Sequence, residues 1–225
     1  FTQTPYPGIE LIDNKDHKSF ETFIDGYADY IKEPDIAKAL DKFNQLRVLC
    51  AVREGAQGLY SLNKAIETYL SKKNLINPNN DYYENRPIII TKNYPDLKLF
   101  NGDVGLIWPD DDGALVACFP QTEGSFIKVS VARLPSIETV FAMTIHKTQG
   151  SEFAQVAMVL PELSGPFLSR ELLYTGLTRA KRQFTYCGEQ SVWVNAVSRH
   201  AARHSGLRIR LGIDQSNTAT VTNET

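Results

Sequence analysis

The sequence predicts an α/β domain that is interrupted by a small all-β insertion. Short apolar runs, typical of buried parallel strands, alternate with helical patterns in the first and last thirds of the chain. The middle third instead contains short strand patterns separated by turn residues, and helical periodicity is absent from it. We therefore expect an α/β domain over 1–85 and 138–211, an inserted barrel over 86–137, and a flexible tail over 212–225.

The first α/β unit is predicted as helix, strand, loop and helix. Apolar residues fall at helical spacing over 34–43, and 46–52 (LRVLCAV) is a short apolar run typical of a buried strand. The run ends at Arg53, and Ser61 is the expected N-cap of the helix that follows. The inner face of that helix is expected to carry Leu62, Ile66, Tyr69 and Leu70.

The inserted segment is predicted to be all β. Asn101-Gly102 and Asp112-Gly113 are strong turn signals within it. Four or five short strands in about fifty residues favour a small SH3-like or OB-like barrel. The strand candidates are 88–90, 103–108, 114–119 and 126–131.

The α/β pattern resumes after the insertion. Three further strands are expected, over 139–145, 155–160 and 184–187. Ser169 is expected to cap a helix that runs through Lys181. A last amphipathic helix is expected over 189–203, and the residues predicted to face inward are Val192, Trp193, Ala196 and Val197.

Composition excludes several classes of protein. The 225 residues are 42% hydrophobic and 22% charged, which allows one good core and argues against wholesale disorder. No apolar run approaches the roughly 20 residues that span a bilayer, so no membrane partner is expected. The three cysteines, Cys50, Cys118 and Cys187, lie in apolar stretches, which predicts buried free thiols and a cytoplasmic location.

The net charge of −2 hides an uneven distribution of charge along the chain. Segment 1–45 is rich in acidic residues, whereas 170–210 is rich in arginine. A local basic face can bind phosphates even on a slightly acidic chain. A solvated helix surface explains the arginines of 199–210 equally well, and the acidic stretch is either a solvated face or a partner surface.

Polar side chains concentrate in three segments, 53–55, 144–153 and 174–181. The first two follow strands, and in open α/β sheets ligands bind beyond the carboxyl ends of the strands. Lys147 and the hydroxyls near it are suited to nucleic-acid phosphates, and Glu152 to a ribose hydroxyl. Taken alone, Glu152 is better explained as an ordinary polar side chain of a loop.

Three motifs in this order resemble those of a known family. TIHKTQGSEF (144–153) and LLYTGLTRAKR (172–182) resemble the last two signature motifs of superfamily 1 DNA helicases, and LCAVREG (49–55) is similar to their fourth motif. The β-rich insertion, with RPIIITKN and LFNGDVG inside it, makes 43–205 most similar to the RecD-like helicases, the family of the exodeoxyribonuclease V alpha subunit. The resemblance implies a RecA-like second motor domain, without its own Walker A motif, and an inserted SH3-like barrel.

By this resemblance, Arg53 and Arg179 are the catalytic arginines that reach the γ-phosphate of ATP. A guanidinium suits that role because its planar fork pairs two oxygens and stays charged. Glu152 is expected to hold the nucleotide sugar, and Gln149 and Gly150 are expected to line the nucleotide cleft.

The same resemblance predicts a track for single-stranded DNA. Thr144 and His146 are expected to face the DNA, and Lys147 is expected to bind its phosphates. In the barrel, Lys92 and Asn93 match the family's signature and are expected to contact DNA.

Phe100, Asn101 and Asp103 also match the family pattern in the barrel. Phe100 could stack a base, which is worth roughly 1–3 kcal/mol in single-strand binders, but a position in the core fits it better. Asn101-Gly102 is expected to be a turn rather than a DNA contact. Two departures from the family pattern, Gly176 for the usual Ala and Ala154 for a common Asp, remove no functional group.

Two parts of a complete ATP motor are missing from this sequence. It contains no G-x-x-x-x-G-K-[ST] and no strand that ends in Asp-Glu, which such motors need to hold the phosphates and Mg²⁺. The resemblance places both before Phe1, so ATP and Mg²⁺ are expected to bind mainly to a preceding half of the full-length protein. This chain alone is expected neither to hold them nor to hydrolyse ATP.

The leading hypothesis is an ATP-dependent 5′–3′ DNA helicase that works with RecB-like and RecC-like subunits in double-strand-break repair and recombination. No compact acidic cluster indicates a nuclease, which the family places in a partner subunit. The alternatives are a stand-alone RecD-like or relaxase-type helicase and a non-catalytic module for DNA binding or subunit docking. Arg53, Gln149, Glu152 and Arg179 argue against the last, because a docking module needs no γ-phosphate clamp.

Overall fold

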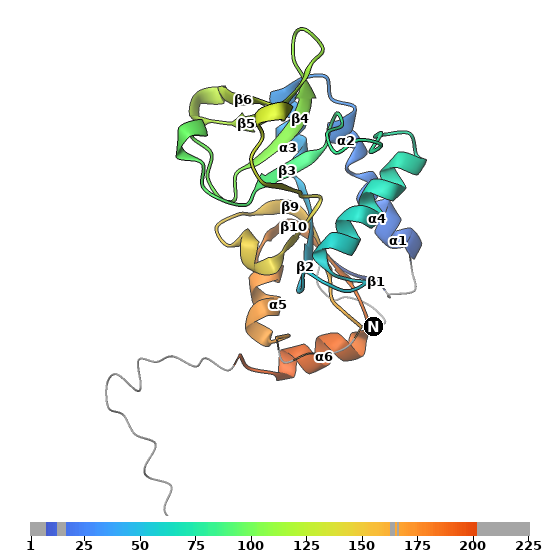
Figure 1. The fold of residues 1–225 in the computed structure, drawn as a ribbon. Helices are drawn as coiled ribbons and strands as arrows, with labels where there is room; N and C mark the ends of the chain where they lie inside the picture. The colour runs from blue at the N-terminus through green and yellow to red at the C-terminus, as the bar shows by residue number, and fades with distance from the viewer. Residues whose placement is uncertain (1–7, 13–16, 163–164, 166, 202–225) are drawn as a thin grey trace, which may run out of the picture.

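The computed structural model describes residues 8–12, 17–162, 165 and 167–201, which form two sheets and their covering helices. In Figure 1 an antiparallel sheet lies at the top and a parallel sheet below it. The expected tail lies outside the described residues. The last helix, expected to run to residue 203, ends at Ser198, because Arg199 is extended. In the described part of the chain, no helix has the length and apolar character needed to cross a bilayer.

The lower sheet confirms the predicted α/β class. Its five strands are all parallel and follow the order β1-β10-β9-β2-β8. Strand β2 is buried at every position, as a strand between two parallel neighbours must be. The strands of this sheet are β1 (Ile9–Ile12), β2 (Leu46–Cys50), β8 (Ala142–Thr144), β9 (Phe153–Val159) and β10 (Ala180–Cys187).

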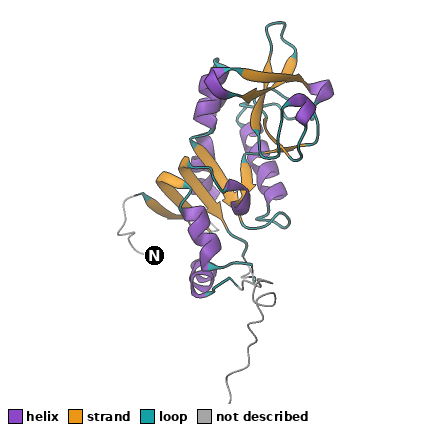
Figure 2. Ribbon diagram, turned by 90° about the vertical axis from the view of Figure 1, so that its left-hand side faces the viewer, coloured by secondary structure: helices purple, strands orange, loops and turns teal. Residues whose placement is uncertain are grey.

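Helices cover both faces of the parallel sheet. Helix α4 packs on β8, helix α5 packs on β9 and β10, and the two helices lie on opposite sides of the sheet (Figures 1 and 2). Helix α3 begins after Asp35, whose side chain accepts a hydrogen bond from the Lys38 N–H. The helices are α1 (His17–Asp25), α2 (Ala28–Ile31), α3 (Ile36–Phe43), α4 (Leu59–Lys72), α5 (Arg170–Leu177) and α6 (Gln190–Ser198).

The upper sheet is antiparallel, in the order β6-β5-β4-β3-β7, and has a small core of its own. Its strand positions confirm the four strand candidates of the insertion. Among the described residues, no ladder joins the edge strands β6 and β7, so the pairing observed is that of an open sheet. The strands are β3 (Pro87–Ile90), β4 (Val104–Pro109), β5 (Leu115–Pro120), β6 (Phe126–Ser130) and β7 (Ile137–Thr139).

The single strand predicted over 139–145 is wrong, because this segment passes from one sheet to the other. Thr139 pairs with Ile88 in the antiparallel sheet, whereas Ala142 pairs with Val48 in the parallel sheet. The two residues between them are fully buried. Hydrophobic patterning shows that such a segment is extended, but it carries no information about which sheet receives each residue.

The helix predicted to run from Ser169 through Lys181 is only partly correct. The Ser169 side chain caps α5, accepting from the Leu172 N–H at 3.3 Å, as predicted. The helix ends at Leu177, however, and Lys181 lies in β10. Pairing of β10 with β9 along most of its length outweighs the local helical pattern here.

Two smaller predictions about helices are also wrong. Helix α4 begins at Leu59 with Gly58 at the N-cap, so Ser61 lies inside the helix. In α6 the Val197 side chain is exposed rather than inward, since the helix packs through Val192 and Ala196. The three cysteines are buried and none of them forms a disulfide, as predicted.

Strand β2 carries a buried arginine, Arg47. The Arg47 side chain is 1% exposed, and its Nη1 donates to the Val140 carbonyl at 2.6 Å. Its guanidinium lies 4.1 Å from the ring centroid of Phe43 and 4.9 Å from that of Phe153. Burial lowers the pKa of Arg47 to about 10, because the core disfavours the charged form. Its Nη2 also donates to Asn44 Oδ1 at 3.2 Å. Two aromatic rings and two neutral oxygen acceptors therefore take the place of a carboxylate partner.

Candidate functional site

Two of the predicted functional segments meet at the carboxyl edge of the parallel sheet. Strand β2 ends at Cys50, which pairs with Thr144 at the end of β8. Arg53 follows β2 by three residues, and Lys147 lies in the 3-10 turn η4 (Ile145–Thr148) that follows β8. The carboxyl-edge position predicted for these segments is thus confirmed for Arg53 and for the first residues of 144–153.

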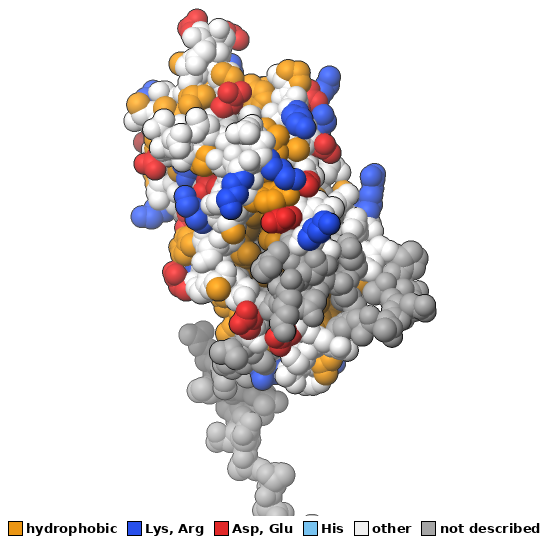
Figure 3. Space-filling model, turned by 90° about the vertical axis from the view of Figure 1, so that its right-hand side faces the viewer, with side chains coloured by type: hydrophobic (Ala, Val, Ile, Leu, Met, Phe, Trp, Pro, Cys, Tyr) orange, Lys and Arg blue, Asp and Glu red, His pale blue; other side chains and the backbone are white. Residues whose placement is uncertain are grey.

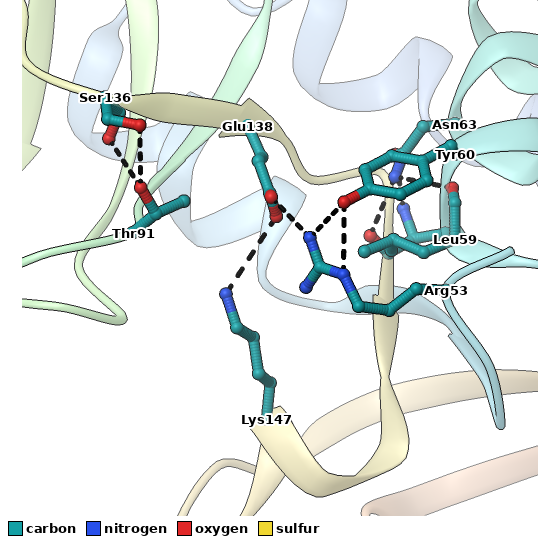
Figure 4. Close-up of polar contacts among 9 residues, drawn as sticks. Arg53, Leu59, Tyr60, Asn63, Thr91, Ser136, Glu138 and Lys147 are labelled. Carbon is teal, nitrogen blue, oxygen red and sulfur yellow. Dashed lines mark hydrogen bonds and ion pairs between the residues drawn. The ribbon is translucent and has the colours of Figure 1, made fainter.

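Arg53 and Lys147 share one carboxylate at this edge (Figure 4). Arg53 Nη2 lies 2.5 Å from Glu138 Oε1, and Lys147 Nζ lies 4.0 Å from Glu138 Oε2. Tyr60 is the other partner of Arg53, since its hydroxyl accepts from Nε at 3.1 Å and from Nη2 at 2.5 Å. Hydrogen bonds to Tyr60 and Glu138 raise the pKa of Arg53 above its ordinary value. We name Arg53, Lys147 and Glu138 the carboxyl-edge cluster.

Sequence reasoning missed Tyr60 and Glu138. No motif surrounds Glu138, which belongs to the short strand β7 of the antiparallel sheet. Tyr60 lies in the first turn of α4, seven residues after Arg53, and is 46% exposed. Glu138 reaches Arg53 only through the fold, since 85 residues separate the two, so no local signal could have identified it.

The rest of the central motif returns to the opposite edge of the sheet. After η4 the chain turns at Gly150, which has φ +88, and enters β9 at Phe153. Gln149, Gly150 and Glu152 are exposed along this return. Glu152 forms an ion pair with Lys181 at 3.1 Å, and both side chains are more than half exposed. A surface pair of this kind is weak, so either partner can be exchanged for a ligand at little cost.

Arg179 lies at this amino edge and is held by the backbone around it. Its Nε donates to the Thr175 carbonyl at 3.0 Å and its Nη1 to the Ser151 carbonyl at 3.0 Å. Its Nη2 donates to the Thr178 hydroxyl at 3.1 Å. An arginine has five N–H groups, so one on each terminal nitrogen is left for a ligand. A guanidinium that is held in this way can bind two oxygens of a phosphate without changing its position.

The structure does not bring Arg53 and Arg179 together. In the register of the sheet, Cys50 is level with Val159, whereas Arg179 precedes Ala180, which is level with Phe153. The six steps of β9 between these levels correspond to about 20 Å at about 3.3 Å per residue. Arg53 and Arg179 thus belong to opposite edges of the sheet, which one motif segment connects.

The candidate residues in the antiparallel part of the chain form a separate exposed group. Lys92 and Asn93 are exposed, and Asn93 Oδ1 accepts from the Asn101 N–H at 2.9 Å. The turn predicted at Asn101-Gly102 is confirmed, with φ +102 at Gly102. The core position expected for Phe100 is wrong, because its side chain is 52% exposed. The Phe100 N–H donates to Asp103 Oδ2 at 2.7 Å, across the turn that contains Asn101-Gly102.

A groove of about 880 Å³ runs along the outer face of α4. It is lined by Tyr60, Tyr69 and three lysines of this helix and its end, and by Glu21 of α1. Figure 3 shows this side of the molecule, where basic, acidic and apolar side chains are interspersed. The mixed surface indicates no single class of ligand, in contrast to the carboxyl-edge cluster.

Strand β8, which ends at Thr144, is an edge strand that is held by Asn63 of α4. Asn63 Oδ1 accepts from the Ala142 N–H at 2.9 Å, and Asn63 Nδ2 donates to the Ala142 carbonyl at 3.1 Å. The side-chain amide thus supplies the two hydrogen bonds that a further strand would make. Because Thr144 is two residues away, Asn63 fixes the start of the central motif.

Replacing Asn63 by leucine is expected to lower the free energy of unfolding by about 2–4 kcal/mol, because two buried backbone groups of Ala142 lose their partner. Urea unfolding of the purified protein measures this. The control is Ser61→Ala, at an exposed position of the same helix, which is expected to change stability by less than about 0.5 kcal/mol. Equal effects of both substitutions would contradict the assigned role of Asn63.

The comparisons with known proteins agree with the motif analysis. Residues 139–185 match the family model described as "UvrD-like helicase C-terminal domain". The "RecBCD enzyme subunit RecD" of Mycobacterium tuberculosis is 38% identical over 173 residues, which cover 77% of this chain and 30% of that protein. The chain is homologous to the RecD-like helicases.

This RecD-like relationship extends to the "ATP-dependent RecD2 DNA helicase" of Deinococcus radiodurans, which is 33% identical over 175 residues, or 74% of this chain and 23% of that protein. The chain thus spans less than a third of the length of these relatives. A solved Pif1 helicase from Candida albicans aligns with 87% of this chain and 58% of its own, at 14% identity and a TM-score of 0.45. That structural similarity is too low to support a conclusion.

Proposed function

We propose that this chain is the C-terminal motor part of an ATP-dependent 5′–3′ DNA helicase. In this proposal its α/β domain is the second RecA-like domain, and the antiparallel sheet is an inserted SH3-like barrel. The observation that carries the proposal is the course of residues 144–153, which cross the sheet from the edge of Thr144 to the edge of Arg179. One short segment can then respond to both nucleic acid and nucleotide.

At the amino edge, Arg179 and Glu152 are the proposed nucleotide contacts, with Gln149 and Gly150 beside them. The two N–H groups that Arg179 has left over fit a terminal phosphate, and the exposed Glu152 fits a ribose hydroxyl. ATP bound with Mg²⁺, mainly by a preceding domain, would supply the phosphoryl transfer that drives the motor. Arg179 would stabilise negative charge on the transferred group.

At the other edge, Thr144, His146 and Lys147 are the proposed contacts to single-stranded DNA. Lys92 and Asn93 would extend this track onto the barrel, where the exposed Phe100 ring offers a base a stacking surface. Phosphate contacts by the lysines would supply most of the affinity, so binding should weaken steeply with salt.

The proposal is tested with the full-length protein, whose reading frame should encode G-x-x-x-x-G-K-[ST] before Phe1. We expect ATP turnover that depends on single-stranded DNA and the displacement of a strand from duplexes with a 5′ tail but not a 3′ tail. ATP turnover by the full-length protein that does not change when single-stranded DNA is added would refute the motor role.

This chain without the preceding domain is expected to show no DNA-stimulated ATP turnover above background. The reason is that the chain lacks the phosphate-binding loop and the magnesium-binding carboxylates. A phosphate-release assay with the purified 225-residue chain, with and without oligonucleotide, measures this. Measurable stimulated turnover would show that the chain carries a complete ATP site.

RecB-like and RecC-like subunits are the proposed partners, and the cytoplasm is the proposed compartment, because the relative from Mycobacterium tuberculosis is named as a RecBCD subunit. The similarity to a RecD2 helicase supports a second candidate, a helicase that acts without these subunits. Purification of the full-length protein from its source, together with any bound subunits, distinguishes the two candidates. Recovery with two large subunits supports the first, and unwinding by the isolated protein supports the second.

A further inference from the structure

Arg53 lies apart from the residues that are proposed to contact the nucleotide. It lies at the carboxyl edge of the parallel sheet, whereas Arg179 and Glu152 lie at the amino edge. Its charged neighbour is Lys147, a proposed DNA contact, because both side chains face Glu138 (Figure 4). Arg53 therefore lies next to a residue of the proposed DNA track.

We propose that Arg53 and Lys147 together bind one backbone phosphate of single-stranded DNA, and that Glu138 occupies this phosphate site while DNA is absent. The inference rests on the proposed function, since it assigns the residues of the same DNA track. Glu138 is then a positioning residue, which holds the two cations in place and must be displaced by the incoming strand.

The geometry of the cluster supports this exchange. The two carboxylate oxygens of Glu138 each face one cation, Oε1 toward Arg53 and Oε2 toward Lys147. A phosphodiester presents two such oxygens as well, and guanidinium groups bind carboxylates and phosphates through the same planar fork. The Arg53 side chain is 40% exposed and that of Glu138 is 27% exposed, so solvent and a ligand can reach the pair.

The hydrogen bonds of Arg53 leave room for a ligand. Its Nε and Nη2 donate to Tyr60 and Glu138, which leaves both N–H groups of Nη1 for another acceptor. Tyr60 does not depend on Glu138 for its contact, so it can keep Arg53 in position when the carboxylate leaves. The ring of Tyr60 also lies 5.0 Å from the guanidinium.

The cluster is continuous with the DNA contacts proposed on the barrel. Glu138 lies in β7, two residues after Ser136. The Thr91 hydroxyl lies 3.0 Å from both the backbone carbonyl and the hydroxyl oxygen of Ser136, and Lys92 and Asn93 follow Thr91 directly (Figure 4). A strand that crosses from the barrel to Thr144 therefore passes the Glu138 carboxylate, where a phosphate could replace it.

The test measures binding of a fluorescent oligothymidylate by the full-length protein over a range of salt concentrations, without ATP. Arg53→Ala is expected to weaken binding roughly tenfold and to reduce the slope of log affinity against log salt by about 0.7, the value for one phosphate contact on a single strand. Glu138→Gln is expected to strengthen binding about threefold to tenfold, because the competing carboxylate charge is removed.

Asp110→Asn is the matched control, since Asp110 forms an ion pair with Lys128 at 2.6 Å in the same antiparallel sheet, away from the cluster. It is expected to change neither affinity nor slope. Measurements of ATP turnover distinguish a DNA-binding role of Arg53 from an ATP-binding role. If Arg53 contacts DNA, Arg53→Ala is expected to raise the DNA concentration for half-maximal turnover about tenfold and to lower turnover at saturating DNA by less than about threefold.

A loss of a hundredfold or more at saturating DNA, with the salt slope unchanged, would overturn the proposal and return Arg53 to the ATP site. Weaker binding by Glu138→Gln, with a melting temperature equal to that of the wild type, would overturn the positioning role. If Glu138→Gln does not fold, the salt slope of Arg53→Ala decides alone. Failure of the wild-type protein to bind DNA or turn over ATP would instead refute the proposed function.

Discussion

Replacing Arg179 by alanine in the full-length protein is expected to lower DNA-stimulated ATP turnover by about a thousandfold or more. Arginines that contact the transferred phosphate contribute on the order of 10³–10⁵ in rate in related chemistry. Arg179 fits such a role because three hydrogen bonds hold its guanidinium and two N–H groups are left over. Steady-state phosphate release at saturating DNA is the measurement.

Two further variants separate the charge of Arg179 from its place in the fold. Arg179→Lys keeps the charge but loses the fork, so it is expected to recover only a small part of the activity. Arg182→Ala removes an exposed arginine three residues later and is expected to retain turnover within about twofold of the wild type. Wild-type turnover by Arg179→Ala would show that another residue contacts the γ-phosphate.

The fold itself should survive the Arg179 substitution. The bonds to Thr175 and Ser151 are made to backbone carbonyls at a partly exposed edge, where water can replace the guanidinium. We expect a loss of only about 1–2 kcal/mol in stability. Unchanged hydrogen exchange in β9 and β10 would show that the loss of activity is chemical.

The largest effect on stability is expected from Arg47→Ala, with a loss of about 3–5 kcal/mol in the free energy of unfolding. The substitution empties the space between the rings of Phe43 and Phe153 and leaves the buried Val140 carbonyl without its donor. Hydrogen exchange of the amides of β2 and β9 in the full-length protein reports this change locally.

Arg47→Met is the informative comparison, because it keeps most of the side-chain volume while removing the buried charge. Burial already disfavours that charge, as the pKa of about 10 shows, so methionine is expected to cost less than alanine by about 2 kcal/mol. Equal losses for both variants would mean that the hydrogen bond to Val140, and not packing, is the main contribution of Arg47.

Much of the fold could be predicted from the sequence because its signals are local. The apolar run of β2, the turn at Asn101-Gly102 and the Ser169 cap each depend on a few neighbouring residues. The strand at Ile9–Ile12 and the helix at His17–Asp25 were not predicted. That strand forms by pairing with β10, about 170 residues further along the chain, which no local pattern records.

The candidate site was predictable only in part, for a similar reason. The motif pattern placed Thr144 and Glu152 on one connected segment, but the sequence could not show that this segment crosses the sheet. The eight residues between Thr144 and Phe153 are enough to cross the sheet, so residues that are close in sequence lie at opposite edges of it. No sequence pattern indicated Glu138, because its partners lie in the loop after β2 and in η4.

The passage of residues 137–144 through both sheets also has a mechanical consequence. If the protein is the proposed motor and its antiparallel sheet holds the DNA strand, tension must pass between that sheet and the α/β domain. Strand β7 is anchored on β3 and strand β8 on β2, with only Val140 and Phe141 between them. A pull along this segment loads each ladder in shear, with its hydrogen bonds sharing the force. The first loop to receive that force begins at Thr144, and it leads to the amino edge of the parallel sheet, where Arg179 lies.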